Sequence, residues 1–216
     1  MLPGTISSSV AMTGMARGNV PVAIFNATLS SLIGIGLTPL LVSLMAHSRG
    51  EGLPLLDTIV GIARLLLLPL LAGQLLRPLL GPWFHRYKAV TGKVDKVVIL
   101  LLVYAAFCDS VAAGLWSNNG MAVIATTLLG AALLLTVMLT LSTLAARRFG
   151  FNREDEIATV FCGSKKTLAS GVPMAKLLFG AHPSIGLIVL PIMFYHQLQL
   201  FVCSILAERY ARRSAA

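Results

Sequence analysis

Apolar residues along this chain fall into long runs that short polar connections separate. A helix needs about 20 apolar residues to cross a bilayer, and several runs are that long. The pattern predicts spanning helices over about 20–46, 54–80, 94–116, 121–146 and 184–207. We therefore expect an all-α membrane protein, a polytopic helical bundle.

A sixth apolar stretch, residues 154–180, is interrupted at its centre. Its middle reads Gly-Ser-Lys-Lys-Thr from residue 163 to residue 167, a composition that breaks helices and offers polar groups. Many secondary transporters build a substrate or ion site from a spanning helix that is broken at mid-membrane. Charged groups at that depth are costly, so they indicate function. The stretch predicts a broken helix with a site at the break.

A shorter stretch, residues 5–16, is rich in Ser and Thr and too short to span. We expect residues 1–19 to form the second half of another broken helix. Each interrupted stretch leads into an apolar helix with similarly spaced small residues, namely Ser31, Gly34 and Pro39 in one and Ser184, Gly186 and Pro191 in the other. A repeated unit of broken and spanning helix is typical of inverted-repeat transporters.

The basic residues indicate which connections face the cytoplasm. They gather after alternate helices, near residues 77–96, 147–153 and 209–213, and the other connections carry few. Cytoplasmic loops of membrane proteins carry the excess of Lys and Arg. The alternation predicts six crossings of the cell's inner membrane, with the C-terminus in the cytoplasm.

Composition supports a membrane protein and excludes other classes. Of 216 residues, 56% are hydrophobic and 12% charged, and soluble domains carry about twice that charged fraction. The net charge of +9 lies in short loops between apolar runs, so it predicts lipid-headgroup contacts and no nucleic-acid partner. Three cysteines lie inside apolar runs at spacings that fit neither zinc nor a disulfide framework: Cys108, Cys162 and Cys203.

Lys165 and Lys166 are the leading candidates for contact with a substrate, and Ser164 and Thr167 flank them. The alternative is an interhelical ion pair, or side chains that reach a water-filled crevice. Adjacent positions of a helix diverge by about 100°. We therefore expect one lysine to point into the site, and we favour Lys165.

Other polar residues in the apolar runs are further candidates. Asp109 is either a proton site or counter-charge for a lysine, or an aspartate hydrogen-bonded at a crevice mouth. His196 and Gln199 share a helix face, and they either line the site or bond a neighbouring helix. Asn26 either lines an ion path or permits close helix packing.

Two stretches of this chain resemble the bile acid:sodium symporter superfamily. Residues 2–19 begin Leu-Pro-Gly-Thr-Ile-Ser-Ser-Ser, and residues 161–175 begin Phe-Cys-Gly-Ser-Lys-Lys. The second run is fairly specific to the bacterial SBF-like branch, whose members also resemble the seventh vertebrate bile-acid carrier. Residues 151–157 and 190–200 support the resemblance, which covers essentially the whole chain.

The resemblance implies a fold of ten transmembrane segments in two inverted repeats. Segments four and nine of that fold are broken and cross near the bilayer centre, and a core domain moves against a panel domain to alternate access. On that pattern, the chain begins inside segment four. Residues 1–216 would then form one partial transporter domain that lacks the first segments.

The resemblance also implies an ion site. The stretch Pro-Gly-Thr-x-Ser-Ser matches a half-helix start that supplies sodium ligands, with Ser8 and Ser9 on ligand positions and Ser7 beside them. In the other broken helix, the carriers have a Glu where this chain has Phe161. The acidic ligand is missing, so an ammonium of Lys165 or Lys166 either replaces the cation or binds an anionic substrate.

These features predict a secondary transporter. It would move a small organic anion by alternating access, coupled to sodium or protons, with no cofactor beyond a sodium ion. The sequence does not specify an oligomeric state. We expect no enzyme, because the sequence has no His-Glu-x-x-His, no Gly-x-Ser-x-Gly and no intramembrane Asp pair. The alternatives are a transport-inactive membrane regulator and a truncated product whose broken helix lacks partners.

Overall fold

The computed structural model describes residues 4–47, 55–112, 114, 121–179 and 185–213. All the regular structure in these ranges is helical, which confirms the all-α class. The helices are α1 (Ile6–Met15), α2 (Val20–His47), α3 (Leu55–Arg86), α4 (Lys88–Ala112), α6 (Met121–Arg148), α7 (Arg153–Ser164), α8 (Leu168–Phe179) and α9 (Ile185–Arg213).

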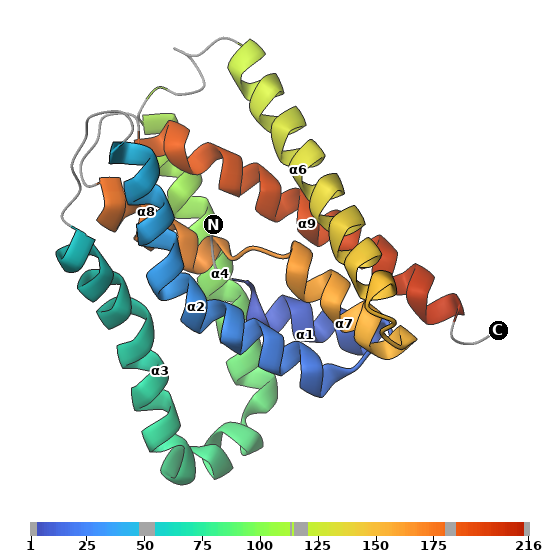
Figure 1. The fold of residues 1–216 in the computed structure, drawn as a ribbon. Helices are drawn as coiled ribbons and strands as arrows, with labels where there is room; N and C mark the ends of the chain where they lie inside the picture. Colours follow the sequence, from blue (N-terminus) through green and yellow to red (C-terminus); the bar gives the residue numbers. More distant parts are fainter. Residues whose placement is uncertain (1–3, 48–54, 113, 115–120, 180–184, 214–216) are drawn as a thin grey trace.

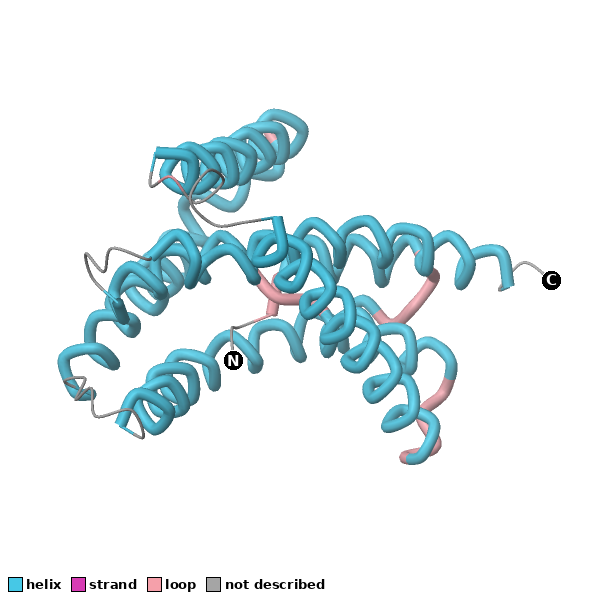
Figure 2. Tube along the Cα trace, turned by 90° about the horizontal axis from the view of Figure 1, so that it is seen from above, coloured by secondary structure: helices cyan, strands magenta, loops and turns pink. Residues whose placement is uncertain are grey.

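Two short helices, α7 and α8, follow one another across the molecule, and the non-helical chain that joins them lies near the centre of the view (Figure 1). Helix α7 packs against α6, α2 and α1, and α8 packs against α9, α3 and α4. In the perpendicular view, the described chain again begins near the middle of the molecule and ends at its edge (Figure 2). The start of the chain therefore lies among the helices, where it can contribute to a site.

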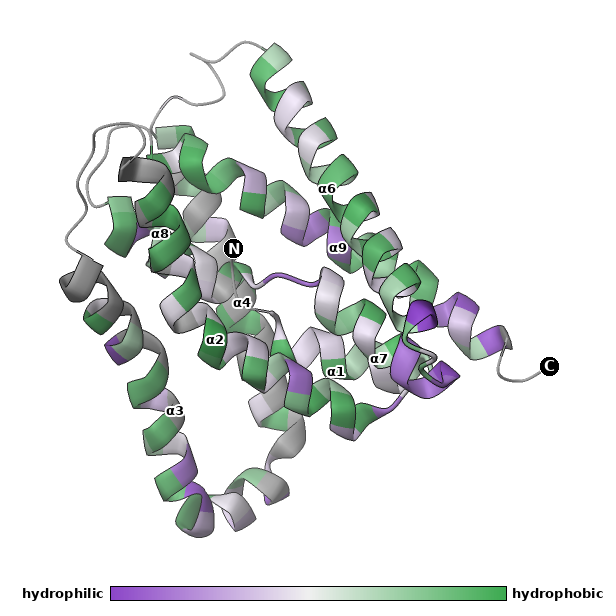
Figure 3. Cartoon of the chain, viewed as in Figure 1, coloured by the Kyte–Doolittle hydropathy of each residue, from purple (hydrophilic) through white to green (hydrophobic). Residues whose placement is uncertain are grey.

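Long apolar helices support a membrane protein. Among the described residues, Met121–Arg148 and Ile185–Arg212 are long and apolar enough to cross a bilayer. The bent pair Val20–Gly34 and Gly36–Val42, which meet at 46°, adds a third span if it crosses as one. Figure 3 shows α6 hydrophobic over most of its length, with hydrophilic residues near its end and around the start of α7. The other expected spans remain predictions.

Local sequence explains where α6 ends and α7 begins. Gly150 has φ +67°, a left-handed conformation that glycine adopts without strain and that commonly closes a helix. The Phe151 N–H then reaches back to the Ala146 carbonyl at 3.0 Å. The Asn152 side chain caps α7 by accepting from the Asp155 N–H at 2.8 Å, and acidic residues fill the first turn, where the helix dipole favours them.

The turn between α1 and α2 is bonded to the start of α7. The Asn19 N–H donates to the Glu154 carbonyl at 3.0 Å, and the Asn19 amide donates to the Asp155 carboxylate at 2.8 Å. Beneath this turn, a buried cluster joins α1, α7 and α9. The cluster consists of Ala16, Ile157, Phe161, Cys203 and Ala207. These contacts set the position of α7, and with it the break that follows.

Replacing Gly18 with alanine should destabilise this junction. A Cβ there would lie 2.5 Å from Cγ2 and 2.9 Å from Cβ of the buried Ile157, and overpacking of this kind costs about 1–3 kcal/mol. We expect a lower midpoint of thermal unfolding in detergent. Gly73→Ala is the control, because no atom lies within 4 Å of a Cβ at that helical position. An unchanged midpoint for Gly18→Ala would contradict the packing described here.

Candidate functional site

The chain between α7 and α8 leaves the helical conformation for three residues, Lys165, Lys166 and Thr167. Lys165 has φ −90° and ψ 132°, an extended backbone. Side chains of successive residues in extended chain point to opposite sides. The break therefore directs its two lysines into different surroundings.

Lys165 is fully buried, with 0% exposure. Its ammonium donates to the backbone carbonyl of Ser8 in α1 at 3.0 Å and lies 5.8 Å from the centre of the Phe161 ring. A carbonyl dipole and an aromatic face both stabilise a cation that has lost its water. Lys165 thus joins the break to the start of the chain, and it lines neither of the two pockets described below.

Lys166 is held through its backbone by helix α9. The Gln199 side chain accepts from the Lys166 N–H at 2.7 Å and donates to the Lys166 carbonyl at 2.6 Å. His196, one turn earlier, places Nδ1 at 2.8 Å from the Gln199 amide nitrogen. We call Gln199, His196 and the Lys166 backbone the amide clamp. It satisfies two backbone groups that the broken helix leaves without helical partners.

A second contact from α9 holds the end of α7. The buried Tyr195 hydroxyl donates to the Ser164 carbonyl at 2.6 Å, and the Ser164 hydroxyl donates to the Val160 carbonyl at 2.7 Å. Sequence reasoning missed Tyr195. Its one signal was a position beside His196, in a helix that also carries Gln199.

The serines at the start of the chain are brought to the break in different ways. Ser9 is buried, and its hydroxyl donates to the Phe161 carbonyl at 3.5 Å. The Ser8 carbonyl receives the Lys165 ammonium, whereas the buried Ser8 and Thr5 hydroxyls have no partner among the described residues. Ser7 is exposed. Of the three serines, Ser8 and Ser9 therefore contact the broken helix.

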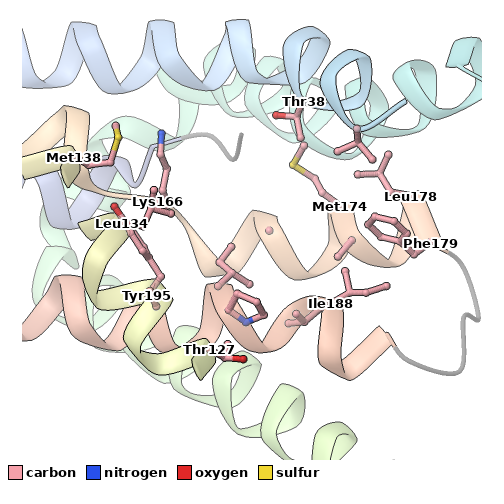
Figure 4. A pocket seen from close by; sticks show the side chains of 18 of the residues that line it. Thr38, Thr127, Leu134, Met138, Lys166, Met174, Leu178, Phe179, Ile188 and Tyr195 are labelled. Atoms are coloured by element: carbon pink, nitrogen blue, oxygen red, sulfur yellow. The ribbon is translucent and has the colours of Figure 1, made fainter. Parts of the chain in front are cut away.

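A pocket of about 730 Å³ lies between α2, α6, α8 and α9. In Figure 4, Lys166 lies at one end of this pocket, and Leu178 and Phe179 lie at the other. Thr38, Tyr195 and Thr127 also line it, among mostly apolar side chains. We call it the apolar pocket.

A second pocket, of about 460 Å³, lies between α2 and α7. Asn26, Ser30, Thr159 and Lys166 line it together with apolar residues. We call it the polar-rimmed pocket. Lys166 is half-buried and borders both pockets. No described side chain pairs with its ammonium, which is therefore available to a ligand.

The remaining expected site residues lie in other places. Thr167 is buried beside the lysines but lines neither pocket. Asp109 belongs to helix α4, and its side chain lies outside the described residues. Within the described ranges, no group of three His, Cys, Asp or Glu residues is placed to hold a metal ion. The lysine break, the clamp and the two serines remain as the candidate site.

Comparison with known proteins identifies relatives over nearly the whole chain. Residues 1–212 match the family model described as the SBF-like CPA transporter family. An uncharacterized protein of Pseudomonas aeruginosa is 50% identical over 212 residues, which cover 98% of this chain and 63% of that protein.

Two further relatives have functional names. A protein of Escherichia coli named "Putative symporter YfeH" is 44% identical over 214 residues, 99% of this chain and 64% of that protein. Sodium/bile acid cotransporter 7 of Rattus norvegicus is 31% identical over 206 residues, 95% of this chain and 60% of that protein. The chain thus spans about three fifths of the length of these relatives.

Proposed function

Because the chain belongs to the SBF-like CPA transporter family, we propose that its protein moves a small organic anion across the inner membrane by alternating access. Transport is coupled to sodium or to protons, and the C-terminus faces the cytoplasm. The names of two relatives, a symporter and a sodium/bile acid cotransporter, support transport as the function. The protein's frame in this proposal is the ten-segment inverted repeat, in which α1 and the α7–α8 pair belong to the two crossing broken helices.

The position of Lys166 carries this proposal. One residue borders both pockets, and its ammonium has no partner among the described side chains. A cation at mid-membrane is costly unless it binds something. An anion supplied from either side would meet the same charge, as alternating access around a fixed site requires.

The apolar pocket indicates what kind of anion is bound. Its hydroxyl groups are already engaged, because Thr126 and Thr127 donate to carbonyls of their own helix and Tyr195 donates to Ser164. The wall therefore offers an apolar surface with one charged group, Lys166. This arrangement favours an amphipathic anion, with its charge at Lys166 and its apolar body toward Leu178.

The ion site of this proposal lies where the start of the chain meets the break. Ser8, Ser9, Ser7, Asn26 and Gln199 are its candidate ligands. The Lys165 ammonium already occupies the Ser8 carbonyl, which supports the view that this lysine stands in place of a bound cation. Asp109, Ser164, Thr167 and His196 are candidates for substrate contact or charge compensation, together with the two lysines.

Uptake into proteoliposomes tests the proposal. The full-length protein would be offered naphthalene-2-sulfonate, a permanent anion with a rigid apolar body, under inward sodium and proton gradients in turn. Naphthalene-2-sulfonamide, the neutral analogue, is the matched control. We expect saturable uptake of the sulfonate that exceeds uptake of the sulfonamide and requires one gradient. If no tested organic anion enters saturably under either gradient, transport fails as the function and a membrane regulator takes its place.

A further inference from the structure

Three polar atoms of the amide clamp lie so close together that their hydrogens fit some protonation states of His196 and not others. The His196 Nδ1 atom lies 2.8 Å from the Gln199 amide nitrogen and 3.2 Å from the Lys166 carbonyl oxygen. The amide nitrogen itself lies 2.6 Å from that carbonyl. Two groups on α9 therefore meet at one backbone oxygen of the break.

The orientation of the Gln199 amide determines the protonation of the ring. The Lys166 N–H is a donor, so the Gln199 oxygen must face it. The amide nitrogen then faces Nδ1, and it has only hydrogens to offer. Nδ1 must accept, which places the ring proton of the neutral imidazole on Nε2.

Protonation of Nδ1 would reverse this arrangement. The new N–H would point at an amide nitrogen that also carries hydrogens, 2.8 Å away. It has an alternative acceptor in the Lys166 carbonyl, 3.2 Å away, which the Gln199 amide currently occupies. The ring in its charged form would thus displace Gln199 from the carbonyl and change how α9 holds the break.

The charges around the ring decide when protonation can occur. Helix α9 packs against α1, α4, α6, α7 and α8. The Lys166 carbonyl oxygen lies 3.2 Å from Nδ1, and the Lys165 ammonium is bonded at the same break, to the Ser8 carbonyl. Titratable residues of the packed helices include Tyr104, Cys108 and Asp109 of α4, Cys162 of α7, Lys176 of α8, and Tyr195 and Cys203 of α9, whereas α1 has none. Carboxylates of α7 and α9 are bonded away from the ring, Glu156 to Arg147, Asp155 to Asn19 and Glu208 to Arg212. Glu154 lies in the first turn of α7.

The partners of the ring are the Lys166 carbonyl and the Gln199 amide, and no described carboxylate bonds to it, so an imidazolium there would share the break with two lysines that no described carboxylate pairs. Like charges at this depth repel strongly. An anion bound at Lys166 would remove much of that repulsion. Anion binding should therefore favour proton binding at His196, and by linkage the proton should favour the anion to the same extent.

We propose that His196 Nδ1 is the proton-binding site that couples transport to a proton gradient, so that one organic anion and one proton move together. This inference rests on the proposed function and names its coupling ion. The proton enters as a bond to the Nδ1 lone pair while the anion is bound at Lys166. It leaves to water when the anion leaves and the Gln199 amide again donates to Nδ1.

The experiment uses the full-length protein in sodium-free proteoliposomes that contain the pH dye pyranine. Naphthalene-2-sulfonate is the probe, because it stays ionised and cannot carry a proton through the lipid by itself. We expect its entry to acidify the interior by about one proton per anion, the capacity of one histidine. Its affinity should rise by about 5- to 150-fold as the pH falls through the range in which the ring titrates.

His196→Asn is the informative variant, because its side-chain oxygen can still accept from Gln199 but cannot take up a proton at these pH values. We expect this variant to lose both the acidification and the pH dependence of affinity. Glu208→Gln, which removes another titratable group of α9 at its exposed end, is the control and should keep both. A melting curve shows whether each variant is folded.

The outcomes separate the inference from the function on which it rests. Sulfonate entry without acidification in the unmodified protein would overturn the inference and leave the transporter proposal standing. Acidification that persists in folded His196→Asn would place the proton at another group and also overturn it. Failure of the unmodified protein to bind or move the sulfonate would remove both proposals. The first and third results come from the unmodified protein, so they test the inference even if a variant misfolds.

Discussion

Replacing Lys166 with glutamine should sharply weaken the apparent affinity for naphthalene-2-sulfonate in uptake while leaving the fold intact. A hydrogen bond to a charged group contributes about 1.5–3 kcal/mol, so the loss corresponds to about 10- to 100-fold in apparent affinity. The fold should survive because the clamp holds Lys166 by its backbone, which glutamine retains. The measurement is the concentration dependence of uptake, with the melting midpoint recorded beside it.

Lys176→Gln is the matched control for this prediction. Lys176 lies on α8, on the C-terminal side of the same break, and its side chain is exposed. It lines neither pocket, so its removal should leave the affinity for the sulfonate within about twofold, as surface substitutions usually change free energies by less than about 0.5 kcal/mol. Equal losses in the two variants would indicate a general effect of positive charge and would argue against a site at Lys166.

Replacing Gln199 with leucine should lower the free energy of unfolding by about 2–4 kcal/mol. The Lys166 N–H and carbonyl would both lose their Gln199 partner inside the bundle, and a buried polar group left unsatisfied costs about 1–3 kcal/mol. His196 can compensate only at the carbonyl, so the N–H remains without a described partner. The midpoint of denaturant or thermal unfolding in detergent measures the effect.

Gln197→Leu makes the same chemical change two residues earlier on α9. Its side chain is exposed, so this substitution should change the stability by less than about 0.5 kcal/mol. The difference between the two variants isolates the clamp from the general effect of a more apolar α9. If Gln199→Leu were as stable as Gln197→Leu, the two hydrogen bonds to Lys166 would not hold the break.

Much of the helical framework could be predicted from the chain without its structure. Long apolar runs have few alternatives in a bilayer, because helices satisfy every backbone group internally. The sequence predicts an interruption near residues 163–167, and in the structure α7 ends at Ser164 and α8 begins at Leu168. Gly, Ser, Lys and Thr in succession make a continuous apolar helix unfavourable, so the local composition is enough to predict the interruption.

The different positions of the two lysine side chains could not be predicted from local composition. Helical spacing predicts side chains about 100° apart, so that one lysine points into the site, and from the sequence we favour Lys165. The break is extended at Lys165, so neighbouring side chains point to opposite sides. The structure places Lys165 against α1 and Lys166 at the pockets. Which lysine borders the pockets depends on backbone dihedrals that composition does not specify.

The clamp and the Tyr195 contact have the same origin. The sequence places His196 and Gln199 on one face of a helix, and that spacing fits a substrate site and a hydrogen bond to a neighbouring helix equally well. The structure shows them bonded to the backbone of the break, 30 and 33 residues away in sequence. Tyr195 meets the Ser164 carbonyl for the same reason, because α7 and α9 pack together through Ile157, Phe161 and Cys203.

Local composition and motifs are enough to predict a helical membrane protein, its family and an interrupted segment. Three other features require the folded chain: which lysine borders the pockets, which serine carbonyl receives the other ammonium, and the meeting of two α9 side chains at one carbonyl of the break. These are contacts between segments far apart in the chain. They form because buried polar groups in an apolar bundle must find partners wherever packing brings them.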